Sequence, residues 1–194
     1  SIMPKGGPSP KIKLDKPKEF KLKNGIRVLV VENHKLPRIN YSLRFDRKPI
    51  VEGEKTGVIS LLGSMLGNGT TNIPKDDFNE EVDFLGAGIN VGFGSGFAFT
   101  LTKNNERVLD LFSDAVINPL LTEEEFEKEK DKLIEGLKSQ KKDIDAISGR
   151  VGDALSYGKN HAYGEFISEQ TINNIKFEDI LEYHAKYFIP NNVY

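Results

Sequence analysis

The strongest constraint on the fold of this chain is a short apolar segment in its first third, bounded by glycine on either side. From Gly57 to Leu66 the apolar residues recur at helical spacing, which predicts a helix with one buried face. Ser60 and Ser64 lie four residues apart and therefore share a second, polar face of the same helix. We expect a packing helix whose inward positions are Leu61, Leu62 and Met65.

Strand and helix patterns occur in mixed blocks along the chain. Asn24-Gly25 separates two β-rich runs and predicts a hairpin of residues 19–31 closed by a type I′ turn, because this dipeptide readily takes positive φ angles. Further strands are expected at 39–45, 89–91 and 97–102, and helices at 75–85, 106–116, 123–142, 145–157 and 177–187. This order predicts an α+β fold, a largely antiparallel sheet covered on one face by helices.

Composition excludes several classes of function. The chain has 194 residues, 38% hydrophobic and 29% charged, which is ordinary for a globular domain. Its 27 Lys and Arg stand against 29 Asp and Glu, so no basic surface for nucleic acid is expected. The absence of cysteine excludes disulfides and thiol catalysis. No apolar run approaches the roughly 20 residues of a membrane span.

Six motifs along the chain resemble those of one protein family, in the same order. Residues 24–28 resemble L-x-N-G-L-x-V, and residues 57–70 resemble G-x-x-H-L-L-E-H-M-L-F-x-G-T. Residues 84–87, 126–130, 161–164 and 190–192 resemble F-x-x-x-G-(A/G), F-E-R-E-R, H-P-Y-G and P-x-N. These are motifs of the pitrilysin/insulinase family of zinc peptidases, the inverted zincins. The resemblance covers nearly the whole chain after residue 18.

The positions that carry the chemistry of this family are replaced here. The resemblance places the two zinc-ligating histidines at Ser60 and Ser64, the catalytic glutamate at Gly63 and the glutamate ligand at Gly136. Zinc peptidases need three protein ligands and an open position for water, and the glutamate takes the proton of that water. Serine is a poor zinc ligand and glycine offers none. The resemblance therefore implies no zinc, no other cofactor and no autonomous peptidase activity in this domain.

The other polar and glycine-rich motifs favour structural roles. Ser60 or Ser64 as a nucleophile would need an activating base, but the histidines follow no recognised triad pattern; they are His34, His161 and His184. The glycines between residues 86 and 96 interrupt a strand pair rather than opening a helix, which disfavours a phosphate loop. The charged run at 123–142 is expected to be a solvated helix with Thr122 as its N-cap.

A peptide-binding edge is the remaining candidate site. In the family, the region around residues 90–97 resembles an edge strand to which an extended substrate peptide adds by β-augmentation. An ordinary flexible hairpin explains the same glycines equally well. The candidate residues are Asn90, Val91, Gly92, Phe93, Gly94, Ser95, Gly96 and Phe97.

Domain organisation follows from composition and from the resemblance. Residues 1–18 are rich in Pro, Gly and Lys and are expected to form a flexible leader. Residues 19–194 are expected to form one domain that stops short of its last strand, because in the family an apolar strand follows this point. Exported bacterial members are the most similar in pattern, so a periplasmic or exported location is expected, with the cytoplasm left open.

The resemblance implies a supporting role rather than catalysis. Bacterial paired peptidases and the mitochondrial processing peptidase combine zinc-bearing and degenerate units, so the expected partners are a zinc-bearing subunit or second domain in an oligomer, and a peptide or unfolded polypeptide. One alternative is a structural or protein-interaction module on the same fold. A third hypothesis, an active zinc metallopeptidase, requires residues outside this chain.

Overall fold

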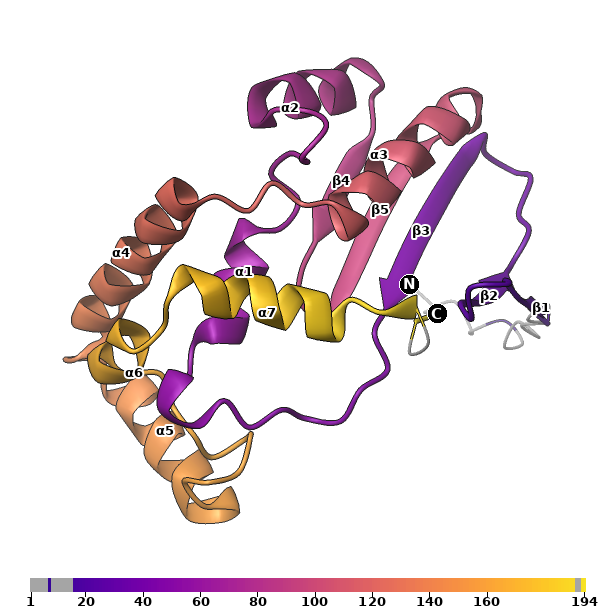
Figure 1. Cartoon of the computed structure of the whole chain (residues 1–194). Helices are drawn as coiled ribbons and strands as arrows, with labels where there is room; N and C mark the ends of the chain where they lie inside the picture. Colours follow the sequence, from indigo (N-terminus) through magenta and orange to yellow (C-terminus); the bar gives the residue numbers. More distant parts are fainter. Residues whose placement is uncertain (1–6, 8–15, 191–192) are drawn as a thin grey trace, which may run out of the picture.

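The computed structural model describes residues 7, 16–190 and 193–194. Residues 1–6 and 8–15 of the expected leader lie outside this described part. The described strands form two antiparallel sheets (Figure 1). One sheet pairs β1 (Lys18–Lys21) with β2 (Arg27–Val30). The other has the order β3 (Arg38–Arg44), β5 (Ser95–Leu101), β4 (Gly88–Val91).

The helices follow the predicted order with one addition. The helices α1 (Val58–Met65) and α2 (Lys75–Phe84) come before β4, and α3 (Asn105–Ile117) comes after β5. The chain then continues through α4 (Glu123–Gln140), α5 (Ile144–Tyr157), α6 (Glu169–Asn173) and α7 (Phe177–Tyr187). The added helix is α6, because five residues are too few to show a helical period in the sequence.

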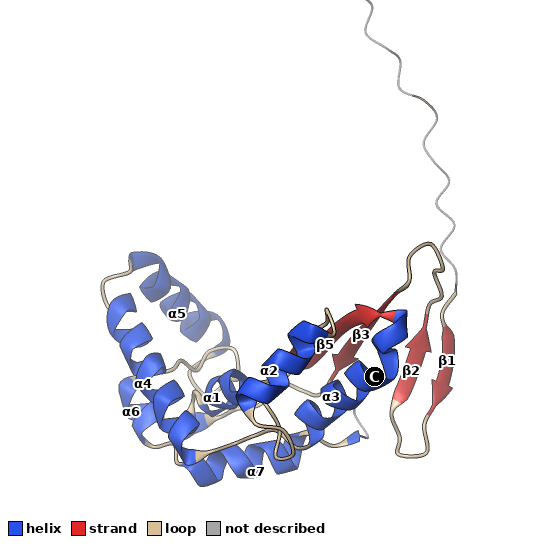
Figure 2. Ribbon diagram, turned by 90° about the horizontal axis from the view of Figure 1, so that it is seen from above, coloured by secondary structure: helices blue, strands red, loops and turns tan. Residues whose placement is uncertain are grey.

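Helices cover one face of the three-stranded sheet, as predicted. Along β5, burial alternates between an inner row and an outer row that contains Phe97, Phe99 and Leu101. On the inner face, the ring of Tyr41 in β3 lies 6.4 Å from the ring of Phe112 in α3. Figure 2 shows α3 and α7 on one side of β3 and β5, with the β1–β2 hairpin standing apart. The predicted α+β class is confirmed.

The N-terminal hairpin is confirmed, but its predicted turn type is wrong. A type I′ turn needs positive φ at both central residues, and only Gly25, with φ 99°, has it. The Leu22 N–H donates to Ile26 O at 2.8 Å, and the Gly25 N–H donates to Leu22 O at 3.0 Å. The loop therefore has three residues and ends in a left-handed glycine, a common alternative that Asn-Gly also fits.

α1 lies at the centre of the hydrophobic core. Its residues Leu61, Leu62 and Met65 are buried as predicted, with exposed fractions of at most 1%. The helix packs against α4 on one side and α7 on the other. The remaining core residues come from both sides of α1 and include Phe78, Ala98, Val108, Leu111, Phe126 and Ile180. Burial of this apolar surface is the main stabilising term for the domain.

Capping confirms the start of the long charged helix. The Thr122 Oγ1 accepts a hydrogen bond from the Glu125 N–H at 3.2 Å, as expected of an N-cap. Its surface carries ion pairs such as Lys128–Glu124 at 2.8 Å. Within the described ranges, no helix is both long and apolar enough to cross a membrane.

Candidate functional site

The two serines of the zinc-like motif lie on the solvent-facing side of α1. Ser60 and Ser64 are both exposed, while the neighbouring Leu61 and Leu62 are buried. The Ser64 Oγ donates to the Leu61 carbonyl oxygen at 2.9 Å, which engages this hydroxyl within its own helix. The helix therefore keeps the two-faced pattern read from the sequence, with small polar groups on its outer side.

Gly63 and Gly136 provide no side chain at the other two positions. Gly63 lies beside the β4–β5 turn, where a Cβ would stand 3.8 Å from the Phe93 backbone nitrogen and 4.0 Å from the Phe93 Cβ. Gly136 is half-buried on α4, and no heavy atom outside its own helix lies within 4 Å of the place of a Cβ. Glu129, also in α4, pairs with Lys132 at 2.5 Å.

These residues do not fit a zinc ion. Zinc is held by imidazole, thiolate or carboxylate groups. The four positions carry instead two serine hydroxyls and two glycines, which have no side chain that could bind a metal. Elsewhere in the described part of the chain, no three His, Asp or Glu side chains come together in a group that could hold a metal. No step that depends on zinc can therefore be assigned to the residues of this site.

A half-buried carboxylate, that of Glu52, binds the N-terminus of α1. The Glu52 Oε2 accepts from the Gly57 N–H at 3.1 Å and from the Ile59 N–H at 2.8 Å. Gly57 has φ 116°, a left-handed angle that favours glycine. Burial raises the pKa of the Glu52 carboxyl, although the hydrogen bonds from Ile59 and Gly57 oppose this shift. The carboxylate accepts hydrogen bonds from N–H groups at the start of the helix, which have no acceptor within the helix itself.

His161 and Glu165, which are spaced like a ligand pair in the sequence, have separate structural contacts. The Glu165 carboxylate accepts from the Glu52 N–H at 2.8 Å and from the Gly53 N–H at 2.9 Å. The His161 ring lies 5.5 Å from that of Tyr157 and 5.3 Å from that of Tyr163. Glu165 thus supports the segment that carries Glu52, and His161 belongs to an aromatic cluster.

The other two histidines lie in unrelated places. His34 is exposed and lies 3.3 Å from the Glu32 carboxylate. His184 in α7 has a ring nitrogen 3.1 Å from the Val116 carbonyl oxygen and stacks on Phe188 at 4.5 Å. Burial lowers the pKa of the His184 imidazole, against the effect of the Val116 contact. Neither residue is brought to Ser60 or Ser64 by any hydrogen bond among the described residues.

The residues of the candidate peptide edge divide between a strand with a free side and a strand without one. Asn90 and Val91 belong to β4, which lies at the end of its sheet. Gly92, Phe93 and Gly94 form the turn, and Gly92 N–H donates to Ser95 O at 2.8 Å. Ser95, Gly96 and Phe97 belong to β5, which is paired on both sides. Of these two strands, β4 therefore lies at the end of the sheet, but its last residue, Val91, is buried and lies against Gly67.

Arg47, which sequence analysis did not identify, connects the β4–β5 turn to the end of α7 by hydrogen bonds. Its guanidinium lies 3.9 Å from the centre of the Phe93 ring and donates to the Phe93 carbonyl oxygen. It also donates to the Tyr187 carbonyl oxygen at 3.1 Å. Phe45 and Phe188 lie beside the same guanidinium. The local sequence carries no signal for this cluster, because its members are far apart along the chain.

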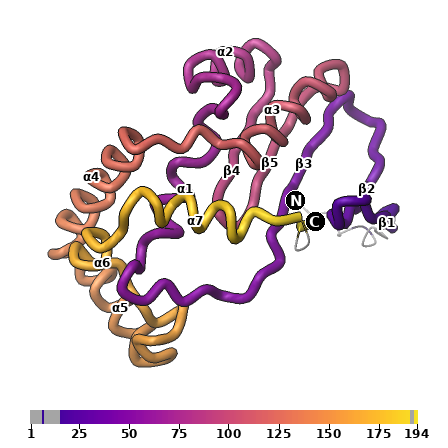
Figure 3. The backbone as a smooth tube through the Cα atoms, in the orientation of Figure 1, coloured from indigo at the N-terminus to yellow at the C-terminus, as the bar shows by residue number. Residues whose placement is uncertain are grey.

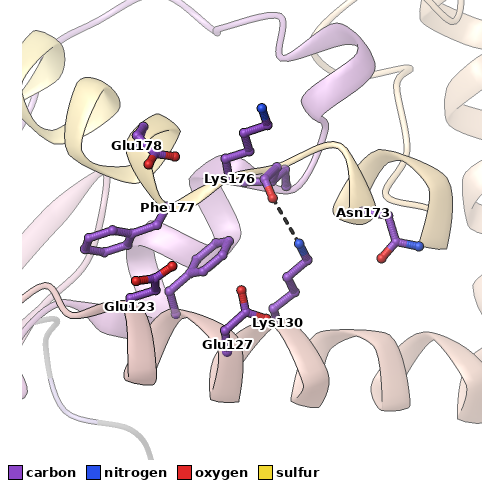
Figure 4. Close-up of a pocket in the computed structure, with 9 residues that line it drawn as sticks. Glu123, Glu127, Lys130, Asn173, Lys176, Phe177 and Glu178 are labelled. Atoms are coloured by element: carbon purple, nitrogen blue, oxygen red, sulfur yellow. Dashed lines mark hydrogen bonds between the residues drawn. The ribbon is translucent and has the colours of Figure 1, made fainter.

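One open pocket lies away from the serine-bearing face of α1. It is a cavity of about 290 Å³ between the start of α4 and the segment that joins α6 to α7 (Figure 4). The Lys130 Nζ donates to the Ile175 carbonyl oxygen at 3.0 Å and lies 5.2 Å from the Phe126 ring. Glu123, Glu127 and Glu178 line the same cavity. Because acidic and basic side chains both line this open pocket, its charge does not indicate one class of ligand.

Comparison with known sequences gives a consistent family. The family model of the insulinases, peptidase family M16, matches residues 50–156. The chain is 23% identical over 183 residues to an uncharacterized zinc protease, YmxG, of Bacillus subtilis strain 168, covering 91% of this chain and 44% of that protein. It is 24% identical over 186 residues to an uncharacterized zinc protease of Rickettsia felis, covering 90% and 44%. The chain spans less than half the length of these curated relatives.

Solved structures share the fold. The peptidase M16 inactive domain from Pseudomonas fluorescens superposes with a TM-score of 0.80 at 24% identity, over 92% of this chain and 45% of that one. A protease from Helicobacter pylori superposes with a TM-score of 0.78 at 22% identity, over 92% and 45%. At these identities the likeness establishes the arrangement of helices and strands.

Proposed function

The chain belongs to the insulinase family, peptidase family M16, and on this basis we propose that it is a non-catalytic domain that supports peptide binding beside a zinc-bearing subunit or second domain. The observation that carries the proposal is the joint replacement of the zinc-motif positions on two packed helices, by Ser60, Gly63, Ser64 and Gly136. The buried face of α1 is kept while the groups for metal and base are gone. A fold kept without its chemistry favours a supporting role.

The free edge of β4 supports peptide binding as the form of that role. Along β4, Asn90 pairs with Phe97 of β5, and the hydrogen-bond alternation set by the Gly92–Ser95 contact directs the N–H group of Ile89 away from β5. When an extended peptide adds as a strand, its carbonyl oxygen can accept a hydrogen bond from this edge N–H. The Arg47 cluster holds the adjoining turn in place, which reduces the ordering that binding requires.

Zinc content and peptidase activity test the loss of catalysis. We expect the purified chain to retain no stoichiometric zinc after dialysis and to cleave no peptide alone. The matched variant restores the family residues as Ser60→His, Gly63→Glu, Ser64→His and Gly136→Glu, and should take up zinc. Stoichiometric zinc and peptidase activity in the unaltered chain would overturn the proposal.

Peptide binding is tested separately from catalysis. We expect an extended peptide to bind and to slow amide hydrogen exchange at Ile89. The same peptide N-methylated at alternate residues is the control, since it cannot complete the strand ladder. Mixing the chain with a zinc-bearing M16 subunit should raise that subunit's activity. Equal binding of the two peptides, together with no stimulation, would argue against this role.

A protein-interaction module is the second candidate, favoured by α5. This helix buries none of its residues, and its apolar row is open to solvent, with Ile144 80% and Leu155 83% exposed. Val151 and Ile147 continue the row at helical spacing. Exposed apolar patches of this kind mark contacts with other proteins. Ile144→Glu with Leu155→Glu should abolish assembly and leave zinc-independent peptide binding unchanged if this second function holds.

The location is proposed from the resemblance to exported members of the family. We propose a periplasmic or exported protein. Fractionation of cells that make the full-length gene product, with a cytoplasmic enzyme as marker, tests this. Recovery with the cytoplasmic marker alone would reject it.

A further inference from the structure

The turn of the first hairpin contains an asparagine whose side chain folds back over the glycine that follows it. Asn24 is exposed, and its Oδ1 accepts a hydrogen bond from the Ile26 N–H at 3.2 Å. A contact from a side-chain oxygen to the N–H two residues further on is an Asx turn. The Gly25 nitrogen belongs to the ring that this hydrogen bond closes, so the Asn24 Cγ is held near that nitrogen.

The same hydrogen bond activates the side-chain amide of Asn24. An N–H donor at Oδ1 draws electron density from the carbonyl group and stabilises the negative charge that forms when Cγ is attacked. Among the described residues, the Asn24 Nδ2 has no hydrogen-bond partner, so this group is open to water. Gly25 has no side chain to hinder the approach of its own nitrogen. Asn24 therefore has a polarised carbon, an accessible leaving group and a nearby nucleophile.

Asn68 also precedes a glycine, but its surroundings hold it in place. Its Nδ2 donates to the Ser64 carbonyl oxygen at 3.3 Å, and the residue is half-buried. Gly69 is buried, and a Cβ there would lie 2.9 Å from the Lys75 backbone nitrogen. The backbone that would have to move is thus tightly packed. Asn68 has the glycine without the freedom.

Asn33 has the same turn as Asn24 without the glycine. It is exposed, and its Oδ1 accepts from the Lys35 N–H at 3.1 Å. The next residue is His34, whose side chain hinders attack by its own backbone nitrogen. Asn68 and Asn33 therefore each lack one of the two features that Asn24 combines.

The hairpin that carries Asn24 can open locally. β1 and β2 form a sheet of their own, and every residue of β1 is exposed. Figure 3 shows the two strands at one margin of the molecule. Because a two-stranded hairpin is only marginally stable, opening will release the Gly25 N–H from the Leu22 carbonyl oxygen, to which it donates at 3.0 Å. The Gly25 nitrogen is then free to react.

We propose that Asn24 is a site of spontaneous deamidation through a cyclic succinimide, with water as the only co-reactant. The Gly25 nitrogen loses its proton and bonds to the Asn24 Cγ. The bond from Cγ to Nδ2 breaks, and Nδ2 leaves as ammonia with one proton added. Water then opens the ring at one of its two carbonyl carbons. Opening at Cγ gives aspartate, opening at the backbone carbon gives isoaspartate, and neither step is an oxidation or a reduction.

Both products change the hairpin. Each replaces a neutral amide by a carboxylate and so adds one negative charge. Isoaspartate also routes the backbone through Cβ, which lengthens the loop between Leu22 and Ile26, now closed by the Leu22 N–H to Ile26 O bond at 2.8 Å. Loop length sets the register of a hairpin. We therefore expect the pairing of β1 with β2 to weaken as isoaspartate accumulates.

Ageing of the unaltered chain at mildly alkaline pH tests the proposal. Digestion and mass spectrometry should show deamidation at Asn24, with Asn68 and Asn33 converted more slowly by about tenfold or more. Isoaspartate and aspartate, separated by chromatography, should both form at Asn24. Equal rates at Asn24 and Asn68 would overturn the proposal. Aspartate without isoaspartate would mean direct hydrolysis and would reject the succinimide.

Ageing in urea separates the effect of the fold from that of the local sequence. Asn24 and Asn68 both precede glycine, so their rates should become similar once the chain is unfolded. A preference for Asn24 that persists in urea would show that the folded turn does not select the site.

A variant at His34 gives an independent gain of reactivity. His34→Gly leaves the Asx turn of Asn33 in place and removes the hindering side chain, so Asn33 should deamidate at a rate similar to that of Asn24. His34→Ala is the matched control and should leave Asn33 slow. Asn33 that stays as slow in His34→Gly as in His34→Ala would contradict the assignment of these two features as the cause.

Discussion

The two faces of α1 differ in the kind of residue that each carries. The inner face consists of large apolar residues that are at most 1% exposed, Leu61, Leu62 and Met65. The outer face carries Ser60 and Ser64, which are exposed and make few contacts. Packing constrains the first face, because interiors are dense and lose stability with each missing methylene. No such packing constrains the second face, which carries small polar residues.

Truncation on the inner face should give the largest effect. Leu62→Ala removes a fully buried side chain of α1, the helix that packs against α4 and α7, so we expect a loss of about 2–5 kcal/mol in the free energy of unfolding. Urea denaturation measures it, with Leu155→Ala on the exposed helix α5 as the matched control. A loss equal to that of the control would contradict the view that α1 is held by its buried face.

Removal of the carboxylate at the start of α1 should rank second. Glu52→Ala leaves the Gly57 and Ile59 N–H groups without their acceptor, and we expect a loss of about 0.5–2 kcal/mol. Glu54→Ala, in the same short turn but exposed, is the control. Thermal unfolding of both variants measures the difference, which should vanish if water replaces the carboxylate without cost.

The same carboxyl group should make stability depend on pH. Because burial raises the pKa of Glu52 in the folded state, its protonated form is favoured by folding. Its contribution is therefore fully present below the ordinary glutamate pKa and is lost as pH rises through the folded-state pKa. The stability of the unaltered chain relative to Glu52→Gln should fall over this range, as followed by denaturation at a series of pH values. A constant difference would show that the pKa is not raised.

Changes on the outer face should give the smallest effect. Ser60→Ala and Ser64→Ala remove exposed hydroxyls, one of which only bonds back to Leu61 O. We expect each to change the free energy of unfolding by less than about 0.5 kcal/mol. Denaturation of the double variant measures this. A loss above 1.4 kcal/mol, about tenfold in the folding equilibrium, would reveal a role for these serines that their contacts do not suggest.

Most of the fold could be read from local patterns. The long segments that form α3, α4 and α7 were placed correctly: α3 buries Val108, Leu111, Phe112 and Ala115 at helical spacing, and the start of α4 was marked by its Thr122 cap. The turn of the first hairpin was not, since Asn24-Gly25 fits two loop types and the pairing of the flanking strands selects between them. The helix α6 was missed because it is short and owes its start to the Ser168 cap.

The candidate site divides in the same way. The replacement of the zinc-motif positions stays a prediction from the sequence, in which apolar flanks fix the register of α1 and the charged motif fixes that of α4. The part played by Arg47 was not visible, because Phe93 and Tyr187 reach it only through the folded chain. Glu52 lies close to α1 in the sequence, but the segment between them contains Gly53 and Gly57 and matches no standard capping motif.

The sequence by itself determined which elements form, which face of each is apolar and which chemical groups the zinc-like helices lack. These properties follow from residue type and spacing, which act over a few residues. The tertiary structure alone decided that β5 is paired on both sides while β3 and β4 lie at the two ends of the sheet. Strand order depends on contacts between residues far apart in the chain, and no local pattern encodes which strands lie at the ends.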